Sequence, residues 1–492
     1  MIESAPSEPA EREVTPLPPT DRGRQAWSFV TAGFAIETLL WGGLFSTGVF
    51  LKYYAANEPF SRSSETKISL IGTTSLFIGY GAGIPLIYLY NRHPRIIKST
   101  VWTGLAVYVA CMLGASWAQS VDALIVLQGV GPGLAGALCA FPVIRWLPEW
   151  FDKRKGLAAG VIFSGGGVGG AYMPILNQYL LDRIGLAWTL RTSALTTAVL
   201  GGTAICFLNP RVPIPATRNV TPAPMPNLRG TFWHPGFFGC LLATLLQGFG
   251  FFNVGLFIPR FSDSLSSTAG AGLLSAFNVS CIIAQILWGF LTDRMRPAMA
   301  MALSSALGSC LVLTLWGFGG SHGIALLVPF AVLFGIASGG FSSMWSQSAC
   351  SIVGHDKEQQ TMLVSGFSFA RGLGAVIGPT IGSALYRESN STPEHHLRWG
   401  SAGSPGLVSL VAASMASSAA VGLLFASCES SSITKLANIL RSFLSPTNAN
   451  QPRRQEERSL ALSDPASAIE LTRIPSRAIP NLESEIDHKV KG

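Results

Sequence analysis

Residues 150–181 read WFDKRKGLAAGVIFSGGGVGGAYMPILNQYLL, a basic cluster followed directly by a long apolar run. An α-helix that crosses the hydrocarbon core of a bilayer needs about 20 mostly apolar residues. The stretch after Lys155 has that length and carries no charged side chain. It therefore predicts a transmembrane helix entered from a basic loop. It decides the fold class because similar runs recur along the whole chain.

The composition agrees with a membrane protein. Of the 492 residues, 48% are hydrophobic and only 12% are charged. A soluble domain carries about 25% charged residues, so this chain has too little polar surface to cover a water-soluble body of its size. The net charge of +8 comes from short basic clusters between apolar runs, which is typical of cytoplasmic loops. We expect an all-α protein that lies in the lipid bilayer and binds no nucleic acid.

The apolar runs fall into two sets of six. A break rich in proline and arginine separates the sets at 211–232 and reads as a cytoplasmic linker. The sequence predicts twelve transmembrane helices in two pseudo-symmetric bundles, one over 27–210 and one over 233–427. The expected spans are 27–51, 67–90, 98–118, 122–147, 155–181, 191–209, 233–258, 268–292, 298–318, 322–347, 360–386 and 403–427.

The loops and tails predict the orientation. Basic residues gather in alternate loops, so both termini are expected in the cytoplasm under the positive-inside rule, with the protein in the plasma membrane. Residues 1–26 are polar and Pro-rich and read as a disordered tail rather than a signal peptide. Residues 428–492 read as a second tail that begins with a short amphipathic helix. An expected outer loop carries a glycosylation sequon at Asn390.

The two sets of spans share internal similarities. The end of the first span, at 45–51, matches the end of the seventh, at 252–258, in the register of its phenylalanines and glycine. The fifth and eleventh spans are both glycine-rich. A loop dipeptide Asn91-Arg92 in the first half corresponds to Asp293-Arg294 in the second. These agreements, in the same order, predict a duplicated architecture with a binding site between the halves.

The chain resembles the major facilitator superfamily in its six-plus-six spans, its long linker and the loop signature at Asp293-Arg294. The resemblance implies that Asn91, Arg92, Asp293 and Arg294 latch neighbouring helices and control the switch between states. Residues 150–160 look like the monocarboxylate-transporter-like branch, fungal type. Residues 21–27 keep a partial second pattern of that branch. The similarity covers about residues 21–427.

The chain departs from this branch where charges are expected. Animal members have a lysine in span one where this chain has Phe45. Members have an arginine in span eight, preceded in animals by an aspartate one turn earlier, and Gln285 and Cys281 align there. These departures put simple lactate-type proton symport in doubt. They favour a larger, more hydrophobic or uncharged substrate.

Two ionisable residues lie well inside predicted spans. Intramembrane charges are costly and tend to serve function. Glu37 in span one is a candidate for proton coupling, because burial in a low dielectric favours the protonated carboxyl. Arg371 in span eleven is a candidate clamp for a carboxylate. The alternatives are a neutral glutamic acid satisfied by a neighbouring helix, and an arginine paired with a loop acid or reaching the membrane surface.

Neutral groups complete the candidate substrate site. Asn253 and Gln285 are the preferred pair, because the resemblance places substrate contacts in spans seven and eight. Asn278 and Phe45 are further candidates. Any single amide also fits a helix–helix hydrogen bond. The sequence shows no metal-ligand set, no cofactor motif and no catalytic constellation, so we expect neither a cofactor nor an enzyme.

We therefore expect a secondary transporter that moves a small organic acid or a hydrophobic metabolite by alternating access. The sequence is compatible with proton coupling and with efflux linked to a biosynthetic pathway, and it does not give the direction of transport. A nutrient monocarboxylate uptake symporter is an alternative. A non-transporting receptor on a transporter scaffold is an alternative of another class.

Overall fold

The computed structural model describes residues 17–213, 234–258, 267–319, 324–386, 399–400 and 405–430. These ranges are helical and contain no strand. The helices of the first half are α1 (Arg24–Phe45), α2 (Thr47–Ala56), α3 (Glu65–Gly81), α4 (Gly83–Arg92), α5 (Ile97–Ala115), α6 (Val121–Leu124), α7 (Gly131–Trp150) and α8 (Lys155–Phe207). Those of the second half are α10 (Pro235–Phe257), α11 (Ser267–Thr292), α12 (Pro297–Leu311), α14 (Ile324–Ser338), α15 (Trp345–Val353), α16 (Lys357–Leu385) and α17 (Pro405–Ser430). Short helical turns connect some of them: η1 (Phe60–Arg62), η2 (Pro94–Ile96), η3 (Ile125–Val130), η5 (Val312–Trp316) and η6 (Phe341–Met344).

The helices are long and apolar enough to cross a membrane. Within the described ranges, 11 continuous helical segments meet this description. One of them, α8, has 53 residues and would extend about 80 Å as a straight helix, far beyond a bilayer core of about 30 Å. Gly185 interrupts it with a φ of 74°, a left-handed conformation that glycine adopts without strain. Counting α8 as two spans raises 11 to twelve, the predicted number.

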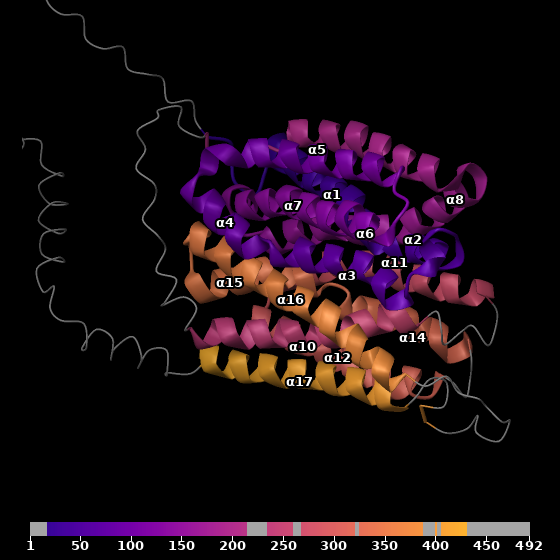
Figure 1. Ribbon diagram of the computed structural model, residues 1–492. Coiled ribbons are helices and arrows are strands. Elements are labelled where there is room, and N and C mark those ends of the chain that lie inside the picture. Colours follow the sequence, from indigo (N-terminus) through magenta and orange to yellow (C-terminus); the bar gives the residue numbers. More distant parts are fainter. Residues whose placement is uncertain are drawn as a thin grey trace, which may run out of the picture. The chain divides into compact units, whose positions relative to one another are not determined.

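The two halves use equivalent helix pairs. In the first half α1 packs against α8, and in the second half α10 packs against α16. These are the first and fifth spans of each half. Between the halves, α8 packs against α11, while α16 packs against α3 and α4. The fifth span thus meets the eighth and the eleventh meets the second, as the internal repeat predicts (Figure 1).

Glycines bring the paired helices into backbone contact. A Cβ atom placed on Gly169 would lie 2.2 Å from the Thr38 carbonyl oxygen and 2.5 Å from the Gly42 Cα. In the second half, a Cβ on Gly374 would lie 2.8 Å from the carbonyl oxygen of Leu245. Close approach of this kind gives van der Waals contact where lipid supplies no hydrophobic force between helices. The glycine-rich character of the fifth and eleventh spans thus has a packing cause.

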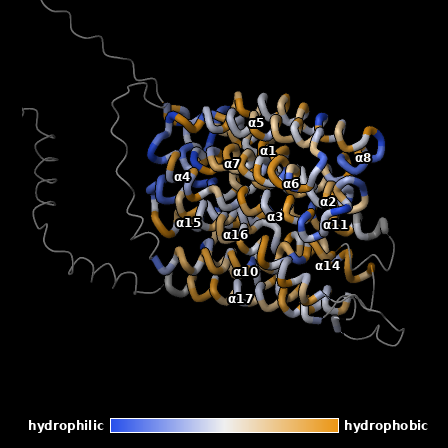
Figure 2. The backbone as a smooth tube through the Cα atoms, viewed as in Figure 1, coloured by the Kyte–Doolittle hydropathy of each residue, from blue (hydrophilic) through white to orange (hydrophobic). Residues whose placement is uncertain are grey.

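The outer surface matches a lipid environment. Ile175, Leu195 and Leu424 are 64%, 66% and 68% exposed, although they are large and apolar. Figure 2 shows hydrophobic residues along the helices and hydrophilic residues gathered at the two ends of the bundle. We call the end at which α8 ends and α10 begins the linker end.

The first helix begins earlier than the sequence predicts. Helix α1 begins at Arg24, inside the expected tail 1–26. Asp21, with a φ of 60°, accepts hydrogen bonds from the backbone N–H groups of Asp152, Lys153 and Arg154 at 3.0, 3.2 and 2.9 Å. The Trp27 ring packs edge-on against Phe151 at 5.8 Å. The part of the tail from residue 17 is therefore anchored to the linker end.

Candidate substrate-binding site

Arg371 lies in the middle of α16 and is only 3% exposed. Its Nη1 donates a hydrogen bond to Oε1 of Gln247 on α10. The Gln247 amide is held in turn, because its Nε2 donates to the Ser338 carbonyl oxygen at 3.0 Å. Arg371 Nε has no hydrogen-bond partner. None of the ion pairs within the described residues includes Arg371, so this buried cation has no carboxylate to neutralise it.

Aromatic rings surround the guanidinium. Its Cζ lies 4.9 Å from the ring centroid of Phe251 and 5.2 Å from that of Phe252, both on α10. The negative face of an aromatic ring attracts a cation at such distances. These contacts compensate part of the lost hydration of Arg371. They leave the Nε donor of Arg371 without a hydrogen-bond partner.

Tyr80, at the end of α3, joins the two halves beside Arg371. Its ring lies 4.5 Å from that of Trp41 on α1 and 6.4 Å from that of Phe252 on α10. Ser368 on α16 donates a hydrogen bond to the Tyr80 carbonyl oxygen at 3.2 Å. The Tyr80 hydroxyl interacts electrostatically with both Arg371 and Glu37. Tyr80 is thus a neighbour of both intramembrane charges that the sequence singles out.

Glu37 lies in α1, one turn before Trp41, and is 4% exposed. Its side chain packs beside the glycines of α8: a Cβ on Gly165 would lie 3.1 Å from Glu37 Cβ. Glu37 belongs to none of the ion pairs among the described residues. The structure therefore presents a buried acid without a cationic partner, next to Tyr80.

The other predicted substrate residues lie against separate neighbours. Asn253 is fully buried, donates to its own helix at the Phe249 carbonyl oxygen (2.7 Å) and faces Gly382 on α16. The backbone of Gln285 packs against Gly160 on α8, and its Oε1 has no partner. No hydrogen bond between Asn253 and Gln285 occurs in the described part of the chain. Their role as substrate contacts stays a prediction.

Asn278 and Phe45 lie at the α8 side of the interface. Asn278 Nδ2 donates to the Gly170 carbonyl oxygen at 3.3 Å, which links α11 to α8. Phe45 is 41% exposed, and its ring lies 6.1 Å from that of Trp41. A Cβ on Gly170 would lie 3.4 Å from the Phe45 ring. Both candidates therefore border Gly170, on α8.

The charge of Arg371 on α16 reaches α11. Cys281 on α11 stands where the family resemblance places the branch aspartate, and it interacts electrostatically with Arg371. The guanidinium therefore lies near this position, although α11 carries no acid there. Sequence alignment along one helix cannot reveal this proximity, because the two residues belong to different helices.

At the linker end, Asp293 of the second half caps a helix of the first half. Its carboxylate accepts hydrogen bonds from the backbone N–H groups of Gly156 at 2.7 Å and Leu157 at 2.8 Å, and from Gln347 Nε2 at 2.9 Å. Burial raises the pKa of Asp293 above its usual range, although these hydrogen bonds oppose the shift. An acid at a helix N-terminus also interacts favourably with the helix dipole.

The first-half copy of this element makes a weaker contact. Asn91 Nδ2 donates to the Glu358 carbonyl oxygen of α16 at 3.4 Å, and its Oδ1 has no partner. Arg92 is exposed. Arg294 is exposed as well and lies over the ring of Phe290, with Cζ 3.4 Å from the centroid. The contacts between the halves are thus asymmetric, and the Asp293 side is the stronger.

Three residues of these clusters were missed by sequence reasoning or given no special weight: Tyr80, Gln247 and Lys155. Lys155 is 2% exposed and donates from Nζ to Gln360 Oε1, across the halves, at 3.0 Å. Gln247 was one of many intramembrane amides, and nothing in the sequence ranks it above the rest. Tyr80 has a usable signal, since it stands between glycines in Gly79-Tyr80-Gly81.

The predicted glycosylation site, Asn390, lies outside the described residues.

A sequence profile described as the Major Facilitator Superfamily matches the chain twice, over residues 33–266 and 240–427. The MFS-type transporter pynF of Aspergillus niger is 28% identical over 341 residues, 68% of this chain and 75% of that protein. The fujikurins efflux protein of Gibberella fujikuroi is 28% identical over 342 residues, 66% and 69% of the two chains.

A solved structure shares the fold. It is a bacterial homologue of the iron transporter ferroportin in an outward-facing state, with a TM-score of 0.60 at 13% identity, covering 82% of this chain and 100% of that one. At this identity the likeness concerns the fold alone. The prediction of a helical transporter fold is confirmed, and so is the predicted similarity to fungal transporters. Because the profile matches cover both bundles, the chain belongs to the Major Facilitator Superfamily and is a multi-pass membrane transporter of a small molecule rather than an enzyme.

Proposed function

We propose that this transporter exports an acidic, largely apolar metabolite and that Arg371 binds the acidic group. The carrying observation is the buried guanidinium without a carboxylate partner among the described residues. Leaving a charge buried and unpaired costs several kcal/mol, on the order expected for removing an ion from water. A carboxylate or enolate of the substrate would repay this cost through charge-assisted hydrogen bonds.

The surroundings favour an apolar body for the substrate. Phe251 and Phe252 flank the guanidinium, and the Tyr80 ring packs at a tilt against Trp41 close by. Flat apolar rings beside a single cation suit a molecule with one acidic group and an extended hydrocarbon or aromatic part. The name of the fujikurins efflux protein describes that relative as an exporter. It supports efflux of a secondary metabolite as the direction.

The remaining details belong to the same proposal. The positive-inside rule supports a cytoplasmic linker end, with both termini inside and the protein in the plasma membrane. Glu37 is the proposed proton-coupling residue, because it is buried and has no ion pair in the described part of the chain. Asn253, Gln285, Asn278 and Phe45 remain proposed substrate contacts. Asn390 remains the proposed glycosylation site, and residues 150–160 support the monocarboxylate-like branch.

The test is transport by the purified protein in liposomes, with a panel of acidic apolar metabolites and their methyl esters. The acids should be transported and the esters should not, because only the acids carry the charge that Arg371 needs. Arg371→Gln should abolish transport of the acids. Arg371→Lys should weaken their binding, because lysine cannot present the planar fork of arginine. Arg62→Gln is a matched control, since the ion pair of Arg62 with Glu58 is exposed.

The outcomes separate the candidates. Equal transport of acids and esters, or unchanged transport by Arg371→Gln, would show that Arg371 is structural. Liposomes loaded with substrate on either side separate efflux from the alternative of monocarboxylate uptake. Binding of a solute without any flux would indicate the receptor alternative.

A further inference from the structure

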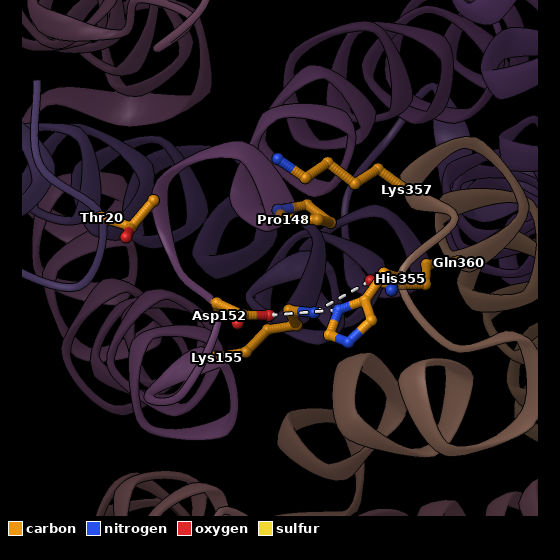
Figure 3. A pocket seen from close by; sticks show the side chains of 7 residues that line it. All are labelled: Thr20, Pro148, Asp152, Lys155, His355, Lys357 and Gln360. Carbon is orange, nitrogen blue, oxygen red and sulfur yellow. Dashed lines mark hydrogen bonds and ion pairs between the residues drawn. The ribbon is translucent and has the colours of Figure 1, made fainter. Parts of the chain in front are cut away.

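We propose that a cavity at the linker end, between the two halves, binds a phosphate-type oxyanion that holds this end closed. We call it the linker-end cavity. It has a volume of about 220 Å³. The residues that line it and matter here are Thr20, Asp152, Lys155, His355, Lys357 and Gln360 (Figure 3).

The buried ammonium of Lys155 carries the inference. Lys155 is 2% exposed, and its Nζ donates a hydrogen bond to the neutral amide oxygen of Gln360 at 3.0 Å. No ion pair within the described ranges includes Lys155. Buried ammonium groups are almost always paired with an anion, because removing the charge from water is costly. A bound anion in the adjoining cavity would supply the missing charge.

The other groups of the cavity set its charge. Lys357 contributes a second ammonium. Asp152 contributes one acid, and its Oδ1 lies 3.9 Å from Nδ1 of His355, whose side chain is 90% exposed. Glu149 lies near Lys357 but is itself paired with Arg145 at 3.0 Å. Two lysines against Asp152 leave an excess of one positive charge.

The chemistry of the lining favours phosphate. Lysine is a common phosphate ligand that acts as a point charge. The Thr20 hydroxyl offers a further hydrogen bond. A tetrahedral oxyanion presents enough acceptors for both ammonium groups and this hydroxyl. Inorganic phosphate and the phosphomonoester headgroup of a lipid share this chemistry.

The position of the cavity gives the anion a consequence for transport. Thr20, Asp152 and Lys155 come from the first half, and His355, Lys357 and Gln360 come from the second (Figure 3). These two sets of residues must separate when the linker end opens. An anion that contacts Lys155 and Lys357 together would be lost on opening. It therefore stabilises the closed arrangement and slows the transport cycle.

The experiment measures the thermal stability of the purified full chain in detergent as inorganic phosphate is added. Sodium chloride of equal ionic strength is the reference. Phosphate should raise the unfolding temperature in a saturable way. Lys357→Gln removes an exposed lysine and should weaken the apparent phosphate affinity about tenfold, as expected for one lost charge-assisted bond. Asp152→Asn should strengthen it.

Lys153→Gln is the matched control, because Lys153 belongs to the same basic cluster but does not line the cavity. It should respond to phosphate like the unaltered protein. A second arm uses liposomes with phosphatidylinositol 4-phosphate against phosphatidylinositol, and a response there alone identifies a lipid headgroup as the source. No stabilisation by either source, or equal weakening by Lys153→Gln and Lys357→Gln, would overturn the proposal.

Discussion

The carboxylate of Asp293 accepts a hydrogen bond of 2.7 Å from the backbone N–H of Gly156, which begins the first turn of a helix in the opposite half. This single contact joins a loop of the second bundle to a helix of the first. It adds to the contacts of Lys155 with Gln360 and of Asn91 with Glu358 that also join the halves at the linker end. The conformational role that the family resemblance implies for Asp293 thus has a specific physical basis in helix capping.

Asp293→Ala should favour opening of the linker end. The substitution leaves the N–H groups of Gly156 and Leu157 without their acceptor, and loss of such a cap costs about 1 kcal/mol. The populations of closed and open states should then change roughly five- to tenfold. Spin labels at Lys153→Cys and Ser351→Cys, with native reactive cysteines replaced, report the distance between the halves. Asp122→Asn at an exposed ion pair is the control, and an unaltered distance distribution in Asp293→Ala would contradict the latch.

The same contact predicts a dependence on pH. Burial raises the pKa of Asp293 in the closed arrangement, whereas water would surround the carboxyl in the open one. The closed state therefore holds the proton more tightly, and lowering the pH from the raised pKa toward the ordinary aspartate value should favour closure. The label pair measures this directly. Asp293→Asn mimics the protonated acid and should stay closed without this pH dependence; a pH response that persists in it would assign the titration to another group.

Tyr80→Phe should tighten the binding of an acidic substrate. The hydroxyl interacts with Arg371 in the structure, so it competes with the substrate for the guanidinium. Removing a competing hydrogen bond is worth about 0.5–1.5 kcal/mol, or roughly two- to tenfold in affinity. Equilibrium binding to the purified protein gives the result. Weaker binding would mean that the hydroxyl contacts the substrate itself.

Glu37→Gln should uncouple transport from the proton gradient. The substitution preserves the shape of a buried side chain that has no ion pair within the described residues, but it removes the group that titrates. Flux driven by a pH gradient should disappear, while exchange of labelled for unlabelled substrate continues. If the gradient dependence is unchanged in proteoliposomes, Glu37 has only a packing role.

Gly169→Ala should destabilise the first bundle. The new methyl group would meet the Thr38 carbonyl oxygen at 2.2 Å, a contact between backbones that cannot relax by a side-chain rotation. Overpacking of this kind costs about 1–3 kcal/mol. Gly48→Ala is the matched control, because no atom lies within 4 Å of a Cβ there. A thermal unfolding scan in detergent should separate the two variants, and equal unfolding temperatures would show that α1 and α8 adjust freely.

The sequence predicts the fold well because lipid imposes a strong composition on each span. Scarce charge, repeated apolar runs and the Asp293-Arg294 signature are readable without coordinates. The direct junction of the fifth and sixth spans at Gly185 is not, because hydropathy falls between 181 and 191 whether the two helices meet at a kink or at a longer loop. The predicted ends of the spans therefore differ most from the ends of the helices where polar residues extend a helix beyond the apolar run.

The candidate site was predicted less completely. Glu37 and Arg371 stand out in the sequence because a charge in an apolar run is rare. Asn253 and Gln285 were chosen by span number alone, and only the packing of the helices shows that Asn253 faces Gly382 and that the backbone of Gln285 meets Gly160. Gln247 and Tyr80 acquire significance only from their distance to Arg371. That information depends on helix packing, which composition does not encode.

The contact of Asp21 and Trp27 with the segment before α8 has a consequence for the evolution of the chain. Both stretches were recognised separately as family patterns, yet Asp21 binds the backbone of residues 152–154 and Trp27 packs on Phe151. They are one structural unit made from two distant pieces of sequence. A chimera that exchanges the amino-terminal segment between two relatives should therefore fold well only if residues 150–154 travel with it.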